Sequence, residues 1–496
     1  MSKRLKPTPF NNTYVKLGED FYAGTSPAPV SNPELIIFNH ALGDEIGLAD
    51  TCLVAHDSAA IYAGNVVPEG AEPVAMAYSG HQFGHFNPQL GDGRALLLGQ
   101  IETPDGTQRD IHLKGTGQTR YSRNGDGRAA LGPVLREYLV SEAMARLGVP
   151  TTRALAAVTT GEEVAREQLL PGGVITRLAT SFVRVGTFEF FASRGDLAAV
   201  TRLADYVIEH NYPACRDHTN PYLALLEAVI ERQAALIAQW MHLGFIHGVM
   251  NTDNMSIAGE TIDYGPCAFM DHYAHDQVYS SIDRNGRYAY NNQPSIGLWT
   301  LTRLAETLVP LLAESTDAGI DAAKAALHAY RELYEGYWLD GMRQKTGLMT
   351  PRDEDKALIE ELLGSMAANR ADFTLTFYYL SQPGMDSEDQ DRHARDLFDD
   401  PGQFDAWAMK WRARLQQDNS NDTVRQARMR AVNPLYIPRN HQIEAAIRAA
   451  EDYGDFSIVH ELHAVLQNPY EQQPQKDAYT LPPEPHEVVR QTFCGT

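Results

Sequence analysis

Residues that could hold a metal ion lie close together near the middle of the chain. The stretch HGVMNTDNMSIAGETIDYG, from His247 to Gly265, contains Asn254 and, nine residues later, Asp263. Hard divalent cations prefer oxygen ligands, and Mg²⁺ takes few protein ligands and completes its shell with phosphate oxygens. The alternative is an Asn that caps a turn and an Asp at a strand end. The spacing favours the metal, so we expect Asn254 and Asp263 to bind Mg²⁺ or Mn²⁺.

The same stretch follows the catalytic-loop pattern of protein kinases, with one substitution. In that pattern a His is followed two residues later by the catalytic Asp, seven residues later by an Asn, and then by an Asp-x-Gly. His247 and Asn254 keep this spacing, but Val249 stands in the place of the Asp. Asp253 is the candidate for the missing base, and the alternative is an ordinary loop acid. We expect His247 to hold the loop by hydrogen bonds.

A lysine that could contact phosphates ends a predicted β-hairpin. Apolar runs at Ala95–Ile101 and Ile111–Leu113 flank a Pro-Asp-Gly turn at 104–106, and this combination favours a hairpin. Lys114 closes the second strand. The following helix begins at Pro133 and carries Glu137.

A strand Lys held by a helix Glu is the arrangement with which kinases contact phosphates. We therefore expect an ion pair between Lys114 and Glu137, with Glu142 as the second choice of partner. The alternative is an exposed lysine at a strand end.

Glycine-rich loops and arginines surround this lysine. The pentapeptide GDGRA occurs twice, at 91–95 and 125–129, and its glycines allow a ligand to approach the backbone closely. Arg177 and Arg184 are seven residues apart, and two guanidinium groups suit a terminal phosphate. Surface salt bridges in an acidic protein are the alternative. Gly91, Gly93 and Arg94 of the first copy, and Asp126 and Gly127 of the second, lie in loops on either side of the hairpin and Lys114.

The order of these segments predicts an α+β fold with two lobes, like that of protein kinases. We expect a β-rich lobe over 1–190, a helical lobe over 191–467 and a loose tail over 468–496 that contains Cys494. Residues 33–63 are predicted to be helical pieces, and 255–263 a tight hairpin. Further helices are predicted at 196–210, 221–243, 295–313, 319–345, 353–369, 403–416 and 441–451.

Composition excludes several classes of protein. The 496 residues carry a formal net charge of −22, which argues against general nucleic-acid binding. No apolar run reaches about 18 residues, so no membrane span is expected. The start of the chain does not resemble a secretory signal. Four scattered cysteines with no CxxC pair favour a reducing cytoplasm. Cys52 and Cys215 are predicted to be buried apolar side chains, and Cys494 an inert or a regulatory thiol.

Three segments together closely resemble the selenoprotein O (SelO/YdiU) family. They are KGTGQTRYSRNGDGRAALGPVLREYLVSEAM, HGVMNTDNMSIAGETIDYGPCAFMD and NPLYIPRNHQIEAAI, and the resemblance covers nearly the whole chain. It implies a kinase-like protein that transfers AMP from ATP to hydroxyl side chains of proteins, with the nucleotide bound in reversed orientation. Transfer of UMP from UTP is attributed to some members. We expect protein substrates, no nucleic-acid or membrane partner, and a monomer.

The resemblance also implies roles for individual residues. Lys114 and Glu137 would form the ion pair between the strand and the helix, and Arg177 and Arg184 would hold the γ-phosphate. Asp253 would be the general base. Asn254 and Asp263 would bind the metal, and Gly91, Gly93, Arg94, Asp126 and Gly127 would contact the nucleotide. The family's selenocysteine motif is not complete here, because the chain ends in FCGT with Cys494 alone.

Two other functions remain open at this point. The loop HGVMNTDN also resembles the HGDxxxxN loop of small-molecule kinases such as aminoglycoside phosphotransferases, so a metabolite kinase is the first alternative. A non-catalytic nucleotide-binding scaffold is the second. The retention of Lys114, Asn254 and Asp263 together argues against the scaffold.

Overall fold

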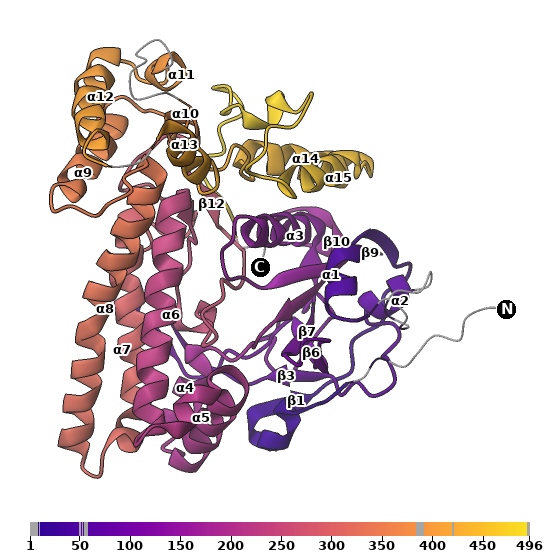
Figure 1. The fold of residues 1–496 in the computed structure, drawn as a ribbon. Helices are drawn as coiled ribbons and strands as arrows, with labels where there is room; N and C mark the ends of the chain where they lie inside the picture. Colours follow the sequence, from indigo (N-terminus) through magenta and orange to yellow (C-terminus); the bar gives the residue numbers. More distant parts are fainter. Residues whose placement is uncertain are drawn as a thin grey trace.

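The computed structural model describes residues 8, 10–48, 51, 53, 58–382, 391–418 and 421–493. Within these ranges the chain is a mixture of α-helices and β-strands (Figure 1), with strands concentrated before residue 180 and helices after it. No helix in the described ranges is long and apolar enough to span a membrane. Cys215 is buried, as expected for a small apolar side chain. The predictions on Cys52 and Cys494 fall outside the described residues.

An antiparallel sheet forms the centre of the N-terminal part. Its strand order is β1-β3-β6-β7-β10-β9-β2, and β8 pairs with β10 in addition. These strands are Tyr22–Gly24 (β1), Glu34–Phe38 (β2), Val74–Met76 (β3), Ala95–Glu102 (β6), Gln108–Lys114 (β7), Ala129–Ala130 (β8), Arg153–Ala165 (β9) and Leu169–Ala179 (β10). Two smaller pairs consist of Gly80–Gln82 (β4) with His85–Asn87 (β5), and Phe245–Ile246 (β11) with Ala268–Phe269 (β12).

The predicted hairpin is present as β6 and β7. Its turn contains Gly106 at a φ of +81°, a conformation that glycine adopts without strain. The Asp105 carboxylate accepts a hydrogen bond from the backbone N–H of Thr107 at 3.1 Å, which closes the turn. Lys114 lies opposite Ala95 on β6 and Ile175 on β10. The lysine therefore leaves the end of a central strand, where the sheet holds its backbone on both sides.

Helix α3 (Leu131–Arg146) packs against β9 and β10 of the sheet. Helices α14 (Asn440–Tyr453) and α15 (Ser457–Leu466) cover α3 from the other side (Figure 1). Because it is covered on both sides, α3 is buried almost all round, including the side chain of Glu137. A buried carboxylate requires a partner, and Lys114 provides one.

Long helices dominate the remainder of the chain. Asn220 caps helix α6 (Pro221–Leu243) by accepting hydrogen bonds from the N–H groups of Tyr222 and Leu223, and Gly244 ends it in the left-handed conformation. Helix α6 packs along α7 (Gln293–Leu312) and α8 (Thr316–Thr346), which also pack on each other (Figure 1).

The helices not yet given are His40–Glu45 (α1), Ser58–Tyr62 (α2), Val185–Ala192 (α4), Leu197–Asn211 (α5), Asp355–Ala368 (α9), Phe373–Leu380 (α10), Arg392–Arg395 (α11), Pro401–Leu415 (α12) and Asp422–Arg430 (α13).

Two local predictions were wrong. Residues 34–38 of the segment expected to be helical form β2, because the run ELIIF pairs with β9 far along the sequence. The hairpin expected at 255–263 is absent. Ser256 instead bridges to Arg184, and Thr261 bridges to Thr151. In both segments partners distant in the sequence override the local signal.

The tail is irregular, as expected, but it is packed. Apart from a short 3-10 helix at Asp477–Thr480, residues 468–493 have no helix. The Tyr470 hydroxyl donates a hydrogen bond to the Leu147 carbonyl at 2.9 Å. At the far end, Thr492 accepts from the N–H of Ser281 and donates its hydroxyl to the Pro266 carbonyl.

Lys345 near the end of α8 is a buried cation with a testable effect on stability. Its ammonium group lies 4.4 Å from the centre of the Phe377 ring, and burial lowers its pKa to about 7. The pKa in the unfolded chain is about 10.4. At pH values between these two pKa values, the folded protein binds fewer protons than the unfolded chain. The unfolding free energy of the wild type therefore rises with pH in this range.

We expect Lys345→Met to raise the unfolding temperature most at pH 7 and below. The variant's unfolding free energy should exceed that of the wild type by roughly 3 kcal/mol less at pH 10 than at pH 7. The reason is that the Lys345 amine of the wild type loses its proton over this range and no longer has to be buried as a cation. Thermal unfolding across this pH range measures the difference. Lys324→Met, an exposed lysine on the same helix, is the control. A stability difference between Lys345→Met and the wild type that does not change with pH would contradict the prediction.

Candidate active site

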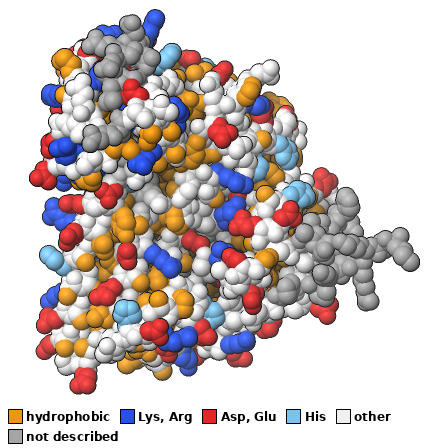
Figure 2. Space-filling model, in the orientation of Figure 1, with side chains coloured by type: hydrophobic (Ala, Val, Ile, Leu, Met, Phe, Trp, Pro, Cys, Tyr) orange, Lys and Arg blue, Asp and Glu red, His pale blue; other side chains and the backbone are white. Residues whose placement is uncertain are grey.

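A cavity of about 690 Å³ brings the predicted residues together between the sheet and the loop 247–265. Cavities of 300–1,000 Å³ are typical of small-molecule sites. Its basic side chains outnumber the acidic ones, although the protein as a whole is strongly acidic. They are Arg94, Lys114, Arg123, Arg128, Arg166, Arg177 and Arg184, against Asp92, Asp126, Asp253 and Asp263. On the face of the molecule that Figure 2 shows, acidic and basic side chains are interspersed. Positive charge is thus concentrated in the cavity, which suits an anionic ligand.

The expected ion pair between Lys114 and Glu137 is present. The Lys114 ammonium donates to Glu137 Oε2 at 2.6 Å and to Asp263 Oδ1 at 3.1 Å. Burial opposes ionisation of Glu137, but Lys114 and Arg177 lower its pKa below the usual value. The second-choice partner, Glu142, is instead held by Arg153 at 2.9 Å. Lys114 is therefore fixed at the cavity wall by two carboxylates.

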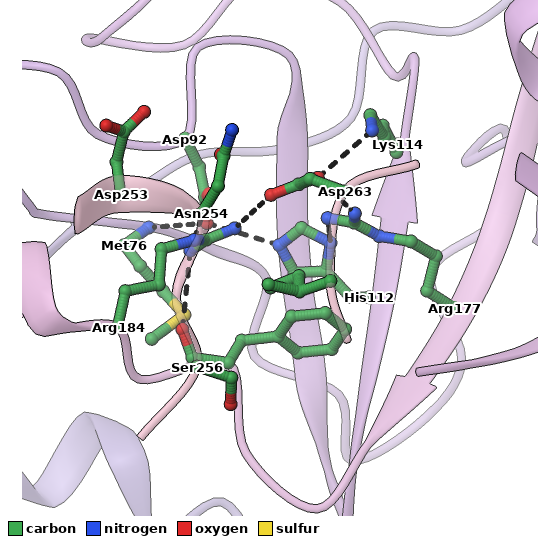
Figure 3. A network of polar contacts seen from close by, with 12 residues as sticks. Met76, Asp92, His112, Lys114, Arg177, Arg184, Asp253, Asn254, Ser256 and Asp263 are labelled. Atoms are coloured by element: carbon green, nitrogen blue, oxygen red, sulfur yellow. Dashed lines mark hydrogen bonds and ion pairs between the residues drawn. The ribbon is translucent and has the colours of Figure 1, made fainter. Parts of the chain in front are cut away.

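Arg177 and Arg184 converge on the same carboxylate (Figure 3). Arg177 Nη1 lies 2.6 Å from Asp263 Oδ1, and Arg184 Nη2 lies 3.4 Å from Asp263 Oδ2. Both arginine side chains are almost completely buried, and each is also stacked on an aromatic ring: Arg177 on Phe182 and Arg184 on Tyr78. Packing of this kind fixes the direction in which each guanidinium donates.

Asp263 is the centre of this charge cluster. Burial would raise its pKa, but Lys114, Arg177 and Arg184 together hold the pKa well below the usual range. The carboxylate is therefore ionised at any physiological pH. Its backbone has a φ of +61°, which a non-glycine residue rarely adopts and which costs about 1–3 kcal/mol. With this backbone conformation, Asp263 lies at the cavity wall.

The loop 247–254 is held as expected, and Val249 cannot act as a base. His247 pairs through Nε2 with the Ile262 carbonyl at 2.9 Å, and burial lowers its pKa. Asn254 Nδ2 donates to the Val249 carbonyl at 3.0 Å. This bond fixes the amide and leaves the Asn254 side-chain oxygen as the available ligand atom. Val249 itself is apolar and buried beside the cavity.

Asp253, the candidate for the missing carboxylate, also lies at the cavity. It lies on the short 3-10 helix Thr252–Asn254 and lines the cavity. Burial raises its pKa to about 7, which is in the range that suits a general base at neutral pH. Gln82 Nε2 donates to Oδ2 at 3.3 Å, whereas Oδ1 has no hydrogen-bond partner among the described residues. Oδ1 is itself buried, so the carboxylate is held by one donor and has a second oxygen without one.

The glycine-rich loops lie at the cavity as predicted. A Cβ on Gly91 would fall 2.3 Å from the Tyr121 ring, and one on Gly127 would fall 2.1 Å from the Gly117 carbonyl. Only glycine fits at these two positions. Gly93 and Arg94 also line the cavity. Asp126 differs from the rest, because its half-exposed carboxylate is paired with Arg166 at the rim.

Comparison with known proteins identifies the family. A family model described as Protein adenylyltransferase SelO matches residues 5–467. The chain belongs to this family. A SelO relative in Rhodopseudomonas palustris (strain BisB5), "Protein nucleotidyltransferase YdiU", is 57% identical over 98% of this chain and 99% of its own. Proteins of the same name in Rhizobium meliloti (strain 1021) and Rhizobium johnstonii are 57% and 56% identical over 98% of this chain, and over 99% and 97% of their own. The protein is a nucleotidyltransferase.

Sequence reasoning missed several residues of this SelO site. Asp92, inside the first GDGRA, accepts from His112 Nε2 at 3.2 Å and lies 3.6 Å from Arg184. His112 accepts in turn from Arg177 at 3.0 Å, and burial lowers its pKa to about 4, so it is neutral. The repeated GDGRA was the one signal that could have indicated Asp92. His112 and Gln82 carry no motif.

Two residues of the cavity wall suit a divalent cation. Asn254 and Asp263 provide an amide oxygen and an ionised carboxylate, both on the cavity wall. Within the described residues no group of three or more His, Cys, Asp or Glu side chains forms a complete metal site. Two oxygen ligands with phosphate oxygens to complete the shell suit Mg²⁺ or Mn²⁺ better than zinc. When bound, such an ion would neutralise charge on the phosphates.

Proposed function

We propose that this protein is an adenylyltransferase that transfers AMP from ATP to Ser, Thr or Tyr hydroxyl groups of other proteins and releases pyrophosphate. The observation that carries the proposal is the cavity itself. A buried valine occupies the place of a kinase base, while a buried carboxylate, Asp253, lies four residues further along the same loop. The family description, Protein adenylyltransferase SelO, supports AMP as the transferred group.

We propose that ATP binds in the reversed orientation, with the γ-phosphate at Arg177 and Arg184. These two guanidinium groups are buried at the inner end of the charge cluster, where a terminal phosphate would gain several charge-assisted hydrogen bonds. The α-phosphate then lies toward Asn254 and Asp253. Lys114 neutralises charge on the phosphates, and Gly91 and Gly127 line the same cavity, where their tightly packed loops contact the nucleotide.

The transfer step follows from this placement. Asp253 accepts the proton of the acceptor hydroxyl, and the hydroxyl oxygen forms a bond to the α-phosphorus. The bond from the α-phosphorus to the oxygen bridging to the β-phosphate breaks, and pyrophosphate leaves with that electron pair. Asn254 and Asp263 would hold a divalent cation, which would neutralise charge on the phosphates, and Arg177 and Arg184 would retain the leaving pyrophosphate.

We further propose that residues 1–190 and 191–467 are the two lobes of a kinase-like fold. The order of parts supports it: glycine-rich loop, strand lysine, helix glutamate, catalytic loop and metal-binding Asp follow one another as in kinases. The ion pair between Lys114 on β7 and Glu137 on α3 has the corresponding partners.

Two labels of ATP test the proposed function. With label at the α-phosphate, proteins of a soluble extract and the enzyme itself should become labelled, with stoichiometric release of pyrophosphate. With label at the γ-phosphate, they should not. Transfer of γ-label to protein or to a small metabolite would contradict the proposal and favour a kinase. Competition by UTP, with α-labelled UTP as the direct probe, separates AMP from UMP transfer.

A further inference from the structure

We propose that the β4–β5 hairpin is a positioning element for the catalytic loop, and that Gln82 orients the Asp253 carboxylate. The inference rests on the proposed role of Asp253 as the base. The hairpin covers only residues 80–87 and belongs to neither the main sheet nor the helical part of the chain. Nothing in its sequence pattern indicates catalysis, and its position is what gives it a role.

Three consecutive residues of the hairpin bind three consecutive residues of the loop. The N–H of His81 donates to Thr252 Oγ1 at 2.7 Å, and the N–H of Phe83 donates to Asn251 Oδ1 at 3.1 Å. Between them, Gln82 Nε2 donates to Asp253 Oδ2 at 3.3 Å. The two backbone contacts fix the register of the hairpin against the loop. The side chain of Gln82 is thereby placed at the proposed base.

A second layer of contacts makes this arrangement rigid. The Glu189 carboxylate on α4 joins His81 Nδ1 at 2.5 Å and accepts from the Thr252 hydroxyl at 2.5 Å. The Tyr288 hydroxyl donates at 2.6 Å to the same Asn251 oxygen that the hairpin contacts. Each end of the three-residue contact is therefore tied to a further element of the protein.

The turn of the hairpin is under strain that these contacts maintain. Phe83 and Gly84 occupy its two central positions with φ of +51° and +84°, as in the type I′ turn that joins two-residue hairpins. Glycine tolerates this conformation, whereas a phenylalanine does so only at a cost. The cost is consistent with an element held in one conformation for function.

Gly80 brings the hairpin close to the base. A Cβ at this position would fall 2.5 Å from Asp253 Oδ1 and 3.0 Å from its Cγ. The backbone of Gly80 does not have a positive φ, so an alanine would be unstrained there except for this collision. Glycine is therefore required here by the space that Asp253 occupies. Gln82 and Gly80 thus constrain the carboxylate from two sides.

The experiment measures AMP transfer from α-labelled ATP for Gln82→Ala, Gln82→Met and Gly80→Ala in the full chain. Gln82→Met keeps the volume of the side chain and removes its donor. We expect kcat to fall by about 10–100-fold in all three, as for loss of a hydrogen bond to a charged group. KM for ATP should stay within about twofold, because the hydrogen bonds from the hairpin to the loop go to Asn251, Thr252 and Asp253 and not to Lys114, Arg177 or Arg184. Gln472→Ala, at an exposed glutamine of the tail, is the control.

A double-mutant cycle distinguishes positioning of the base from a general structural role. In an Asp253→Ala background, Gln82→Met should cause no further loss of kcat, since its target is gone. A wild-type kcat in Gln82→Met, or losses that multiply in the double variant, would overturn the inference. Thermal unfolding confirms that each variant is folded. Failure of the wild type to transfer α-label would instead overturn the proposed function itself.

Discussion

Replacing Asp263 with alanine is expected to abolish nucleotidyl transfer. The variant loses a ligand of the proposed metal ion, which neutralises charge on the phosphates as the transition state forms, and a rate loss of ~10³-fold or more follows. It also leaves Lys114, Arg177 and Arg184 without the carboxylate that all three contact. Transfer of α-label under saturating Mg²⁺ or Mn²⁺ measures the loss, and excess chelator should reproduce it in the wild type.

Stability and catalysis must be separated in this experiment. Removing one partner from a buried charge cluster costs about 3–5 kcal/mol, so thermal unfolding of Asp263→Ala should be compared with that of Asp263→Asn, which preserves the volume. Asp321→Ala, at an exposed acid of α8, is the control for loss of one negative charge. Wild-type turnover in Asp263→Ala, or in excess chelator, would contradict the metal-binding role.

Replacing Asp253 with alanine is expected to lower kcat by about 10²–10⁴-fold, the usual contribution of a general base. The nucleotide should still bind, because the basic residues of the cavity are untouched. Single-turnover release of pyrophosphate measures the chemical step without product release. Asp253→Asn should be as impaired as Asp253→Ala, since an amide has a similar shape and does not accept the proton.

The companion variant Val249→Asp tests whether the base alone decides the reaction. It restores the kinase-type carboxylate, yet transfer of γ-label to protein should remain absent, because Arg177 and Arg184 would still hold the γ-phosphate away from the acceptor. Gain of γ-transfer in Val249→Asp would contradict the reversed orientation of ATP. An unchanged kcat in Asp253→Ala would remove Asp253 from the mechanism.

The parts of the fold that were predictable are those in which neighbouring residues decide the structure. The hairpin of β6 and β7 follows from a Pro-Asp-Gly turn between two apolar runs, and α6 follows from its apolar content between Asn220 and Gly244. The failures have a common cause. Residues 34–38 become a strand because β9 pairs with them. Residues 255–263 form no hairpin, and Ser256 and Thr261 instead bridge to Arg184 and Thr151, which lie outside the strands.

The same distinction holds for the candidate site. Spacing within the loop 247–265 selected Asn254 and Asp263, whereas Asp253 was a candidate beside Asn254 whose role the family resemblance implied. The structure places all three at one cavity. Their catalytic roles stay predictions. His112 could not be predicted, because nothing near it in the sequence marks it. Its role depends on hydrogen bonds to Arg177 and Asp92, which form only in the folded protein. Gln82 could not be predicted either, since it lies 171 residues from its partner Asp253 in the sequence.

The packing of Thr492 has a practical consequence for anyone who modifies this protein. Its hydroxyl bonds to the Pro266 carbonyl, only three residues after Asp263, although 226 residues separate the two in sequence. Its backbone also joins Tyr279 and Ser281, beside Ile282 of the cavity wall. We therefore expect an affinity tag, a fluorescent label or a truncation near Thr492 to disturb the packing at the edge of the cavity. A purification tag near Thr492 can therefore change the activity that is being measured. A fluorophore at the same place would report on structural changes at the edge of the cavity.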